Sequence, residues 1–157
     1  MCFWIEVSDG DQAWLEKTIP QNDGKKRGLL APASKRYENF FKNVKVCDVV
    51  FSYLAKTLTL KKEWQSSIVG ISTVVRPYYE LRGTLYVETC NDLELPLPIK
   101  YASIRKKQGF SLKFQKMINA SMQKYLIEIS PVDFKKLIKI HMKNYVFLKN
   151  TEYNKYI

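Results

Sequence analysis

The stretch of the sequence best suited to chemistry is polar and spans residues 56–66, with three lysines and one tryptophan: Lys56, Lys61, Lys62 and Trp64. Two apolar runs flank it, residues 46–55 and 67–75, and both are rich in Val, Ile, Phe and Tyr, as buried strands are. We therefore expect an exposed loop between two strands, with Trp64 unprotected beside cations. Because lysines attract phosphates and bases stack on aromatic rings, this loop favours contact with nucleic acid.

Groups able to perform catalysis are scarce. His141 is the sole histidine, and the core-type residues around it on an expected helix favour packing over a role as general base. The sequence has no G-x-S-x-G elbow, no glycine-rich loop ending in Lys-Ser and no zinc-binding helix motif. Glu16 and Lys17, the nearest approach to a metal-dependent nuclease, resemble ordinary residues of an amphipathic helix. We interpret the chain as a binding protein without cofactor or metal.

The chain is strongly basic. Its 26 Lys and Arg residues outnumber 15 Asp and Glu, which gives a formal charge of +11 and a pI of about 9.5. A polyanionic partner is the first expectation, against the alternative of a basic protein that is merely soluble. Besides Trp64, we expect these cations to contact a nucleic-acid backbone or groove: Lys25, Lys26, Arg27, Lys35, Arg36, Lys61 and Lys62. A further basic cluster comprises Lys100 and residues 105–107.

Cysteine usage and hydropathy bear on the compartment. Cys2, Cys47 and Cys90 are odd in number and lack the close pairs of a zinc site or disulfide framework, so we expect buried free thiols in a reducing compartment. The N-terminal apolar run is too short for a signal-peptide core, and no apolar run approaches the roughly 18 residues of a membrane span. We expect a soluble cytoplasmic protein without a membrane partner.

With 157 residues, the chain suits one domain of the α+β class. The patterns predict strands at residues 2–7, 46–55, 67–75, 84–90 and 125–129, and helices at 11–19, 34–44, 111–122 and 131–143. Ser130 and Pro131 form a clear start for the last helix. We expect loops at 21–28 and 77–83, a sheet broken by Pro96 and Pro98, and a linker or C-terminal extension at 144–157 after a domain at 1–143.

The order of several motifs resembles the EVE domain, a PUA-like module related to the YTH domain. The resemblance spans roughly residues 2–141 and rests on DVVFSY, SIVGISTVV, PYYE, LYVETCNDLELPLPI, FQKMINAS and YLIEISPVDFKKLIKI. Its individual matches are Asp48, Val50, Phe51, Tyr53, and the residues 68–71, 78–80 and 129–132. The resemblance implies a PUA-like (EVE/YTH-like) twisted mixed β-barrel with surrounding helices.

The resemblance also implies a pocket that receives a modified base flipped out of its strand. One wall falls after the first expected helix and the other at a tyrosine pair, and the residues that read the base edge come late in the chain. The implied pocket residues are Leu29, Leu30, Ala33, Ser34, Tyr53, Tyr78, Tyr79, Asn119 and Ser121. YTH domains have tryptophan in both walls, so leucine and tyrosine here depart from that family. The loop with Trp64 is also longer than the usual hairpin.

These expectations converge on a reader of modified duplex DNA. The resemblance implies the targeting domain of a modification-dependent restriction system, with N6-methyladenine favoured over 5-modified cytosine and a motor or nuclease domain C-terminal to this segment. An RNA reader of the YTH or PUA type is the main alternative, and it differs by contacts to the ribose 2′-hydroxyl. A nuclease or RNA-modifying enzyme and a protein-interaction module are the others.

Overall fold

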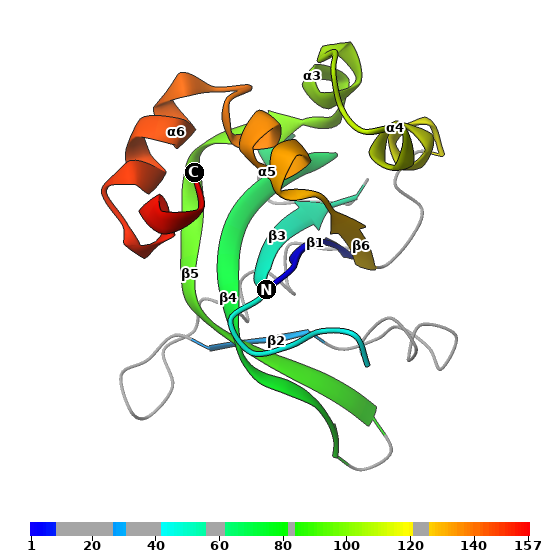
Figure 1. Cartoon of the computed structure of the whole chain (residues 1–157), viewed down its shortest axis with the longest axis vertical. Helices are drawn as coiled ribbons and strands as arrows, with labels where there is room; N and C mark the ends of the chain where they lie inside the picture. Colours follow the sequence, from blue (N-terminus) through cyan, green and yellow to red (C-terminus); the bar gives the residue numbers. More distant parts are fainter. Residues whose placement is uncertain (9–26, 31–41, 56–61, 82–83, 121–125) are drawn as a thin grey trace.

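A six-stranded mixed sheet dominates the structure, a computed structural model that describes residues 1–8, 27–30, 42–55, 62–81, 84–120 and 126–157 (Figure 1). The strand order is β2-β5-β4-β3-β1-β6, with β1 parallel to β3 and the other described pairs antiparallel. The strands are β1 Phe3–Ser8, β2 Arg27–Leu30, β3 Val49–Leu54, β4 Ser67–Leu81, β5 Thr84–Lys100 and β6 Leu126–Ile129. The expected α+β class is confirmed.

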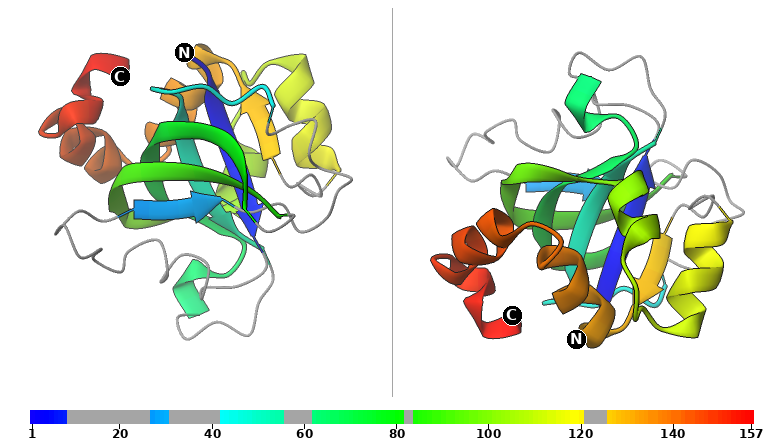
Figure 2. Two further views of the ribbon diagram at one scale, coloured as in Figure 1. Left: turned by 90° about the horizontal axis from the view of Figure 1, so that it is seen from below. Right: turned by 90° about the horizontal axis from the view of Figure 1, so that it is seen from above.

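Helices lie around this twisted sheet, chiefly at one end of it (Figures 1 and 2). They are α3 Tyr101–Lys106, α4 Leu112–Asn119, α5 Pro131–Ile138 and α6 Met142–Lys149, with 3-10 turns η2 Lys62–Trp64 and η3 Glu152–Tyr156. The expected helix at 11–19 and most of that at 34–44 lie outside the described residues. Among the described residues, no helix combines the length and apolar character needed to cross a membrane.

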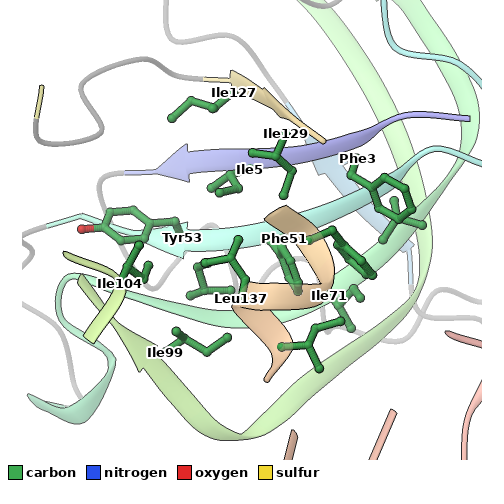
Figure 3. Packing of buried hydrophobic residues seen from close by; sticks show 14 of the residues in the cluster. Phe3, Ile5, Phe51, Tyr53, Ile71, Ile99, Ile104, Ile127, Ile129 and Leu137 are labelled. Atoms are coloured by element: carbon green, nitrogen blue, oxygen red, sulfur yellow. The ribbon is translucent and has the colours of Figure 1, made fainter. Parts of the chain in front are cut away.

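The main core lies between the sheet and α5. Alternate residues of β1 and β3, among them Phe3, Ile5 and Phe51, lie on the side of the sheet where α5 packs (Figure 3). The ring centroid of Phe134 in α5 lies 4.2 Å from that of Phe3 and 4.9 Å from that of Phe51. Leu137 continues the same contact one turn later. Burying such a side chain contributes about 1.5–3 kcal/mol, so α5 is held by its apolar face rather than by its short backbone ladder.

Both long strands pass through prolines, against the expectation of a loop at 77–83 and a broken sheet at Pro96 and Pro98. Arg76 pairs with Glu88 and Tyr79 with Tyr86, so β4 has one more residue than β5 between these pairs. Pro77 lies in that bulge, where its missing N–H costs no ladder hydrogen bond. Residues 95–98 of β5 likewise lie between successive paired positions, so Pro96 and Pro98 fall outside the regular ladder.

The segment at 144–157, expected as a linker or extension, instead folds into α6 and η3 and packs on the core. Asn144 is fully buried, and its side chain donates to the carbonyl of Leu97 (2.8 Å) and accepts from the amide of Leu97 (3.0 Å). The carboxamide thus takes the place of a strand partner at the irregular part of β5. Tyr153 is also fully buried in the main core.

The expected helix at 131–143 begins as predicted but ends early. The Ser130 hydroxyl accepts a hydrogen bond from the amide of Asp133, as an N-cap does. The helix stops at Ile138, and His141, in an extended backbone conformation, is the N-cap residue that precedes α6. The cysteines also differ from expectation, because Cys47 is exposed with a φ of 70° while Cys2 and Cys90 are half-buried.

Candidate nucleic-acid interface

Trp64 does not have the exposed position that its charged neighbours suggested. Its side chain is only 4% exposed and packs with Leu54 and Val69 in a small separate apolar cluster. The 3-10 turn η2 directs the ring under the start of β4, while Lys62 and Glu63 of the same turn face solvent. The expectation of an exposed Trp64 is therefore wrong, because the 3-10 turn buries one of its three side chains against the sheet while the other two face solvent.

The structure brings the two expected pocket walls onto β2 and β4, which are separated by β5 in the sheet. Leu29 and Leu30 of β2 pair with Glu88 and Val87 of β5, and β5 in turn pairs with the part of β4 that holds Tyr79. Backbone pairing alone thus places the leucines two strands from the tyrosine. Tyr78 is exposed, with 40% of its surface accessible, and Tyr79 is partly buried.

Tyr79 belongs to a compact polar cluster on this hairpin. Its hydroxyl donates to the Glu88 carboxylate at 2.8 Å, and the Arg76 guanidinium lies 3.7 Å from its ring centroid. Arg76 also pairs with the same Glu88 oxygen at 3.4 Å. One face of the Tyr79 ring is therefore already covered by a cation, so a base that stacks on this face must displace Arg76.

The structure places the other described pocket candidates elsewhere. Tyr53 is a core residue of β3, 4% exposed beside Ile104, and this burial raises the pKa of its hydroxyl (Figure 3). Asn119 ends α4, which lies at the opposite end of the structure from the outer part of the β4–β5 hairpin (Figure 1). Neither joins Tyr79 in one pocket. These candidates lie outside the described residues: Lys25, Lys26, Ala33, Ser34, Lys35, Arg36, Lys61 and Ser121.

The second face of the sheet carries a buried polar row that the sequence patterns did not reveal. Glu6, Ser52, Ser72 and Thr89 are each at most 2% exposed, on four different strands. Glu6 pairs with Ser52 across β1 and β3, and Thr89 pairs with Gly28 of β2. Ser52 and Ser72 lie within the apolar runs 46–55 and 67–75, and the face that they share is set by strand register.

Two hydroxyls of this row have no hydrogen-bond partner among the described residues: the Oγ atoms of Ser52 and Ser72. A buried hydroxyl without a partner costs about 1–3 kcal/mol, so most such groups are paired or serve a ligand. They lie on the face that holds Trp4, Val50 and Val74, opposite the face covered by α5. This face therefore offers apolar walls together with free hydrogen-bonding groups.

Two buried aspartates, Asp48 and Asp133, by contrast, are used by the fold. Asp48 accepts from the amide of Cys2 (2.6 Å) and from the indole Nε1 of Trp4 (2.9 Å), which ties β1 to the turn before β3. Asp133 accepts from the amide and hydroxyl of Ser111 and from the hydroxyl of Ser130. Among the described residues, no three His, Cys, Asp or Glu side chains form a group that could hold a metal ion.

The excess positive charge belongs to the helical part of the chain. Residues 100–157 contain 13 Lys and Arg against three Asp and Glu, whereas residues 1–99 contain 13 against 12. Among the described cations of this part, only Lys113 forms an ion pair with a carboxylate, that of Glu128, at 3.1 Å. The helical layer around the sheet is therefore a strongly electropositive surface. The positive charge of the clusters at 25–36 and 61–62 is nearly balanced by the acidic residues elsewhere in residues 1–99.

The sheet order, the parallel β1–β3 pair and the helices around the sheet define a PUA-like fold of the EVE and DUF55 type. No protein-family model and no curated protein matches the chain. Several solved structures, however, are similar to this chain. Protein PSPTO5229 from Pseudomonas syringae is 11% identical with a TM-score of 0.66, over 88% of this chain and 98% of that chain.

Two human structures share the fold as well. The DUF55 domain of human thymocyte nuclear protein 1 is 15% identical with a TM-score of 0.62, over 88% of this chain and 97% of that chain. The human THYN1 protein in complex with DNA containing 5-methylcytosine is 14% identical with a TM-score of 0.61, over 91% of this chain and 98% of that chain. At such identities the likeness concerns the fold.

Proposed function

We propose that this protein binds DNA and reads a modified base, without catalysing a reaction itself. The observation that carries the proposal is the fold shared, over 91% of the chain, with the human THYN1 protein, whose structure contains DNA with 5-methylcytosine. The electropositive helical layer supports it, because an excess of unpaired cations attracts phosphates irrespective of sequence. We place 5-methylcytosine first and N6-methyladenine, which the family resemblance favoured, second.

The buried polar face of the sheet is the proposed reading site. A base turned out of the duplex needs apolar walls and a few polar groups that meet its edge. The hydroxyls of Ser52 and Ser72 can donate or accept, and the neighbouring Trp4, Val50 and Val74 are apolar. Leu30, which pairs with Val87 on this face, remains a proposed wall residue. Leu29 and Tyr79 both partner Glu88, whose neighbours Val87 and Thr89 face the polar row, so these two positions fall on the opposite side of the sheet.

The experiment is a titration of otherwise identical duplexes that contain 5-methylcytosine, N6-methyladenine or no modification. An enclosed methyl group contributes about 0.8 kcal/mol, so a reader should prefer one modified duplex by at least about fourfold. Placing the modified base opposite an abasic site should tighten binding, since less pairing is lost on flipping. Equal affinities for all duplexes would reject the reading function, and a preference for a matched RNA would make the protein an RNA reader instead.

The variant Ser72→Ala tests the reading site. This variant should bind the preferred duplex about fivefold more weakly, because it loses one hydrogen bond to the base. Its affinity for the unmodified duplex should not change. Ser103→Ala, on α3 away from the polar face, is the matched control and should change neither affinity. If Ser72→Ala leaves the preference intact, the buried face does not read the base.

The wider context that the resemblance implies, a modification-dependent restriction system, belongs to the same proposal. It requires a motor or nuclease partner, encoded on the same chain or next to it. Co-expression of this protein with such a neighbour should give degradation of modified DNA only, and degradation of unmodified DNA as well would refute the targeting role.

A further inference from the structure

A depression lies between α3 and α4, in the helical part of the structure. It has a volume of about 260 Å³ and is lined by both helices and by the residues that connect them. Ile104, Phe110 and Ile118 form its floor, since each is at most 4% exposed. The hydroxyl of Tyr101 donates to the carbonyl of Ile118 at 2.6 Å, which fixes α4 against α3. We call this depression the α3–α4 pocket.

The rim of the α3–α4 pocket is cationic and amide-rich. Arg105, Lys107, Gln108 and Asn119 line it, and all four are exposed to solvent. None of its lining residues is acidic. In the sequence, no acid occurs between Glu94 and Glu128, and the latter is already paired with Lys113 at 3.1 Å. An anion at this rim would meet donors on several sides and no carboxylate among the lining residues.

A third cation comes from another element. Lys136 of α5 donates from its Nζ atom to the carbonyl of Gly109, a lining residue. Gly109 has a φ of +82°, which favours glycine, and a Cβ there would lie only 3.1 Å from that Nζ atom. The glycine turn thus lets Lys136 approach and neutralise a carbonyl that would otherwise repel an anion.

We propose that the α3–α4 pocket binds one phosphodiester group of the nucleic-acid backbone. Arg105 offers the planar pair of donors that suits two phosphate oxygens, and Lys107 adds a point charge. Gln108 and Asn119 can donate from their carboxamides. The volume lies below the roughly 300–1,000 Å³ typical of small-molecule sites, so a phosphate-sized group fits better than a larger ligand. The proposal rests on the proposed DNA binding and gives Asn119 a contact with the backbone rather than with a base.

Stability alone is the competing explanation for these cations. Arg105 and Lys106 lie in the last turn of α3, where positive charge interacts favourably with the helix dipole. That role predicts a lower melting temperature on substitution and unchanged binding of the folded protein. A phosphate site predicts an unchanged melting temperature and weaker binding of the folded protein.

The test combines protein variants with duplexes in which one phosphate at a time is replaced by an uncharged methylphosphonate. The full wild-type chain should bind about tenfold more weakly when the methylphosphonate stands at one particular position or at its neighbour. This figure assumes two exposed charge contacts to the phosphate, each of which contributes about threefold to affinity. The variant Arg105→Ala/Lys107→Ala should bind about tenfold more weakly, be insensitive at those same positions, and show a log-log salt slope smaller by about one.

The matched control is Lys143→Ala/Lys149→Ala, which removes the same charge from exposed positions on α6, on the other side of the helical layer (Figure 2). It should keep the methylphosphonate-sensitive positions of the wild type. Inorganic phosphate is the second probe, and tight saturable binding of it in the absence of DNA would assign the pocket to free phosphate instead. Melting curves establish that each variant is folded.

The outcomes separate this proposal from the function on which it rests. If the wild-type protein binds no DNA, both are overturned. If it binds DNA and prefers a modified base, but Arg105→Ala/Lys107→Ala keeps the same sensitive positions, only the phosphate site is overturned. If the double variant loses sensitivity at those positions and keeps its preference for the modified base, the backbone and base contacts are separate sites, as proposed.

Discussion

Replacing Trp64 with alanine should strongly destabilise the protein, although the neighbouring residues are lysine, glutamate and glutamine. The indole is 4% exposed and packs with Leu54 and Val69, both fully buried. Truncation of a buried tryptophan costs about 3–5 kcal/mol, through lost burial and through the cavity that remains. Because domains have only about 5–15 kcal/mol of stability, this one change removes a large share of it.

Thermal unfolding followed by circular dichroism measures this loss. For a chain of this length, 3–5 kcal/mol corresponds to a fall in melting temperature of roughly 6–20 °C. Leu112→Ala is the control, because that side chain is 77% exposed and should change stability by less than about 0.5 kcal/mol. A melting temperature of Trp64→Ala within two degrees of wild type, together with weaker DNA binding, would refute the packing role and restore a contact with nucleic acid.

Three further outcomes are expected. Burial alone would raise the pKa of Asp133, but hydrogen bonds from Ser111 and Ser130 outweigh this and lower the pKa below its usual value. The stability that its ionised form contributes is therefore present above about pH 4 and is lost as the pH falls further. The variant Asp133→Asn should make stability depend less on pH in that window. Deletion of residues 144–157 should abolish cooperative unfolding, as it removes Tyr153 and other core side chains worth several kcal/mol. DNA affinity should fall with salt at a log-log slope of about −4 to −5, for four to six neutralised phosphates, and a flat response would exclude electrostatic binding.

The elements with strong local signals were predictable from the sequence. The strands around Phe51 and Ile68 are continuous apolar runs, and the start of α5 combines a serine cap with proline at the first helical position. These signals act within a few residues, so no tertiary contact is needed to interpret them. The order of these motifs along the chain also indicated the PUA-like fold.

Features that depend on distant partners were not predictable. Pro77, Pro96 and Pro98 look like strand breakers until the register shows that they fall between paired positions. Trp64 looks exposed because its apolar neighbours, Leu54 and Val69, lie on adjoining strands rather than beside it in sequence. The same limit applies to the site, since the polar row on the second face exists only once strand register aligns its serines.

The contact between Asn144 and Leu97 bears on when the protein can fold during its synthesis. The first strand, β1, pairs with β6 near the other end of the chain, and the irregular part of β5 obtains its hydrogen bonds from α6. A ribosome-bound chain from which β6 and α6 have not yet emerged therefore exposes an incomplete sheet with open backbone donors and acceptors. Most of the folding must follow synthesis of α6, and until then the unpaired strands are open to association with other chains.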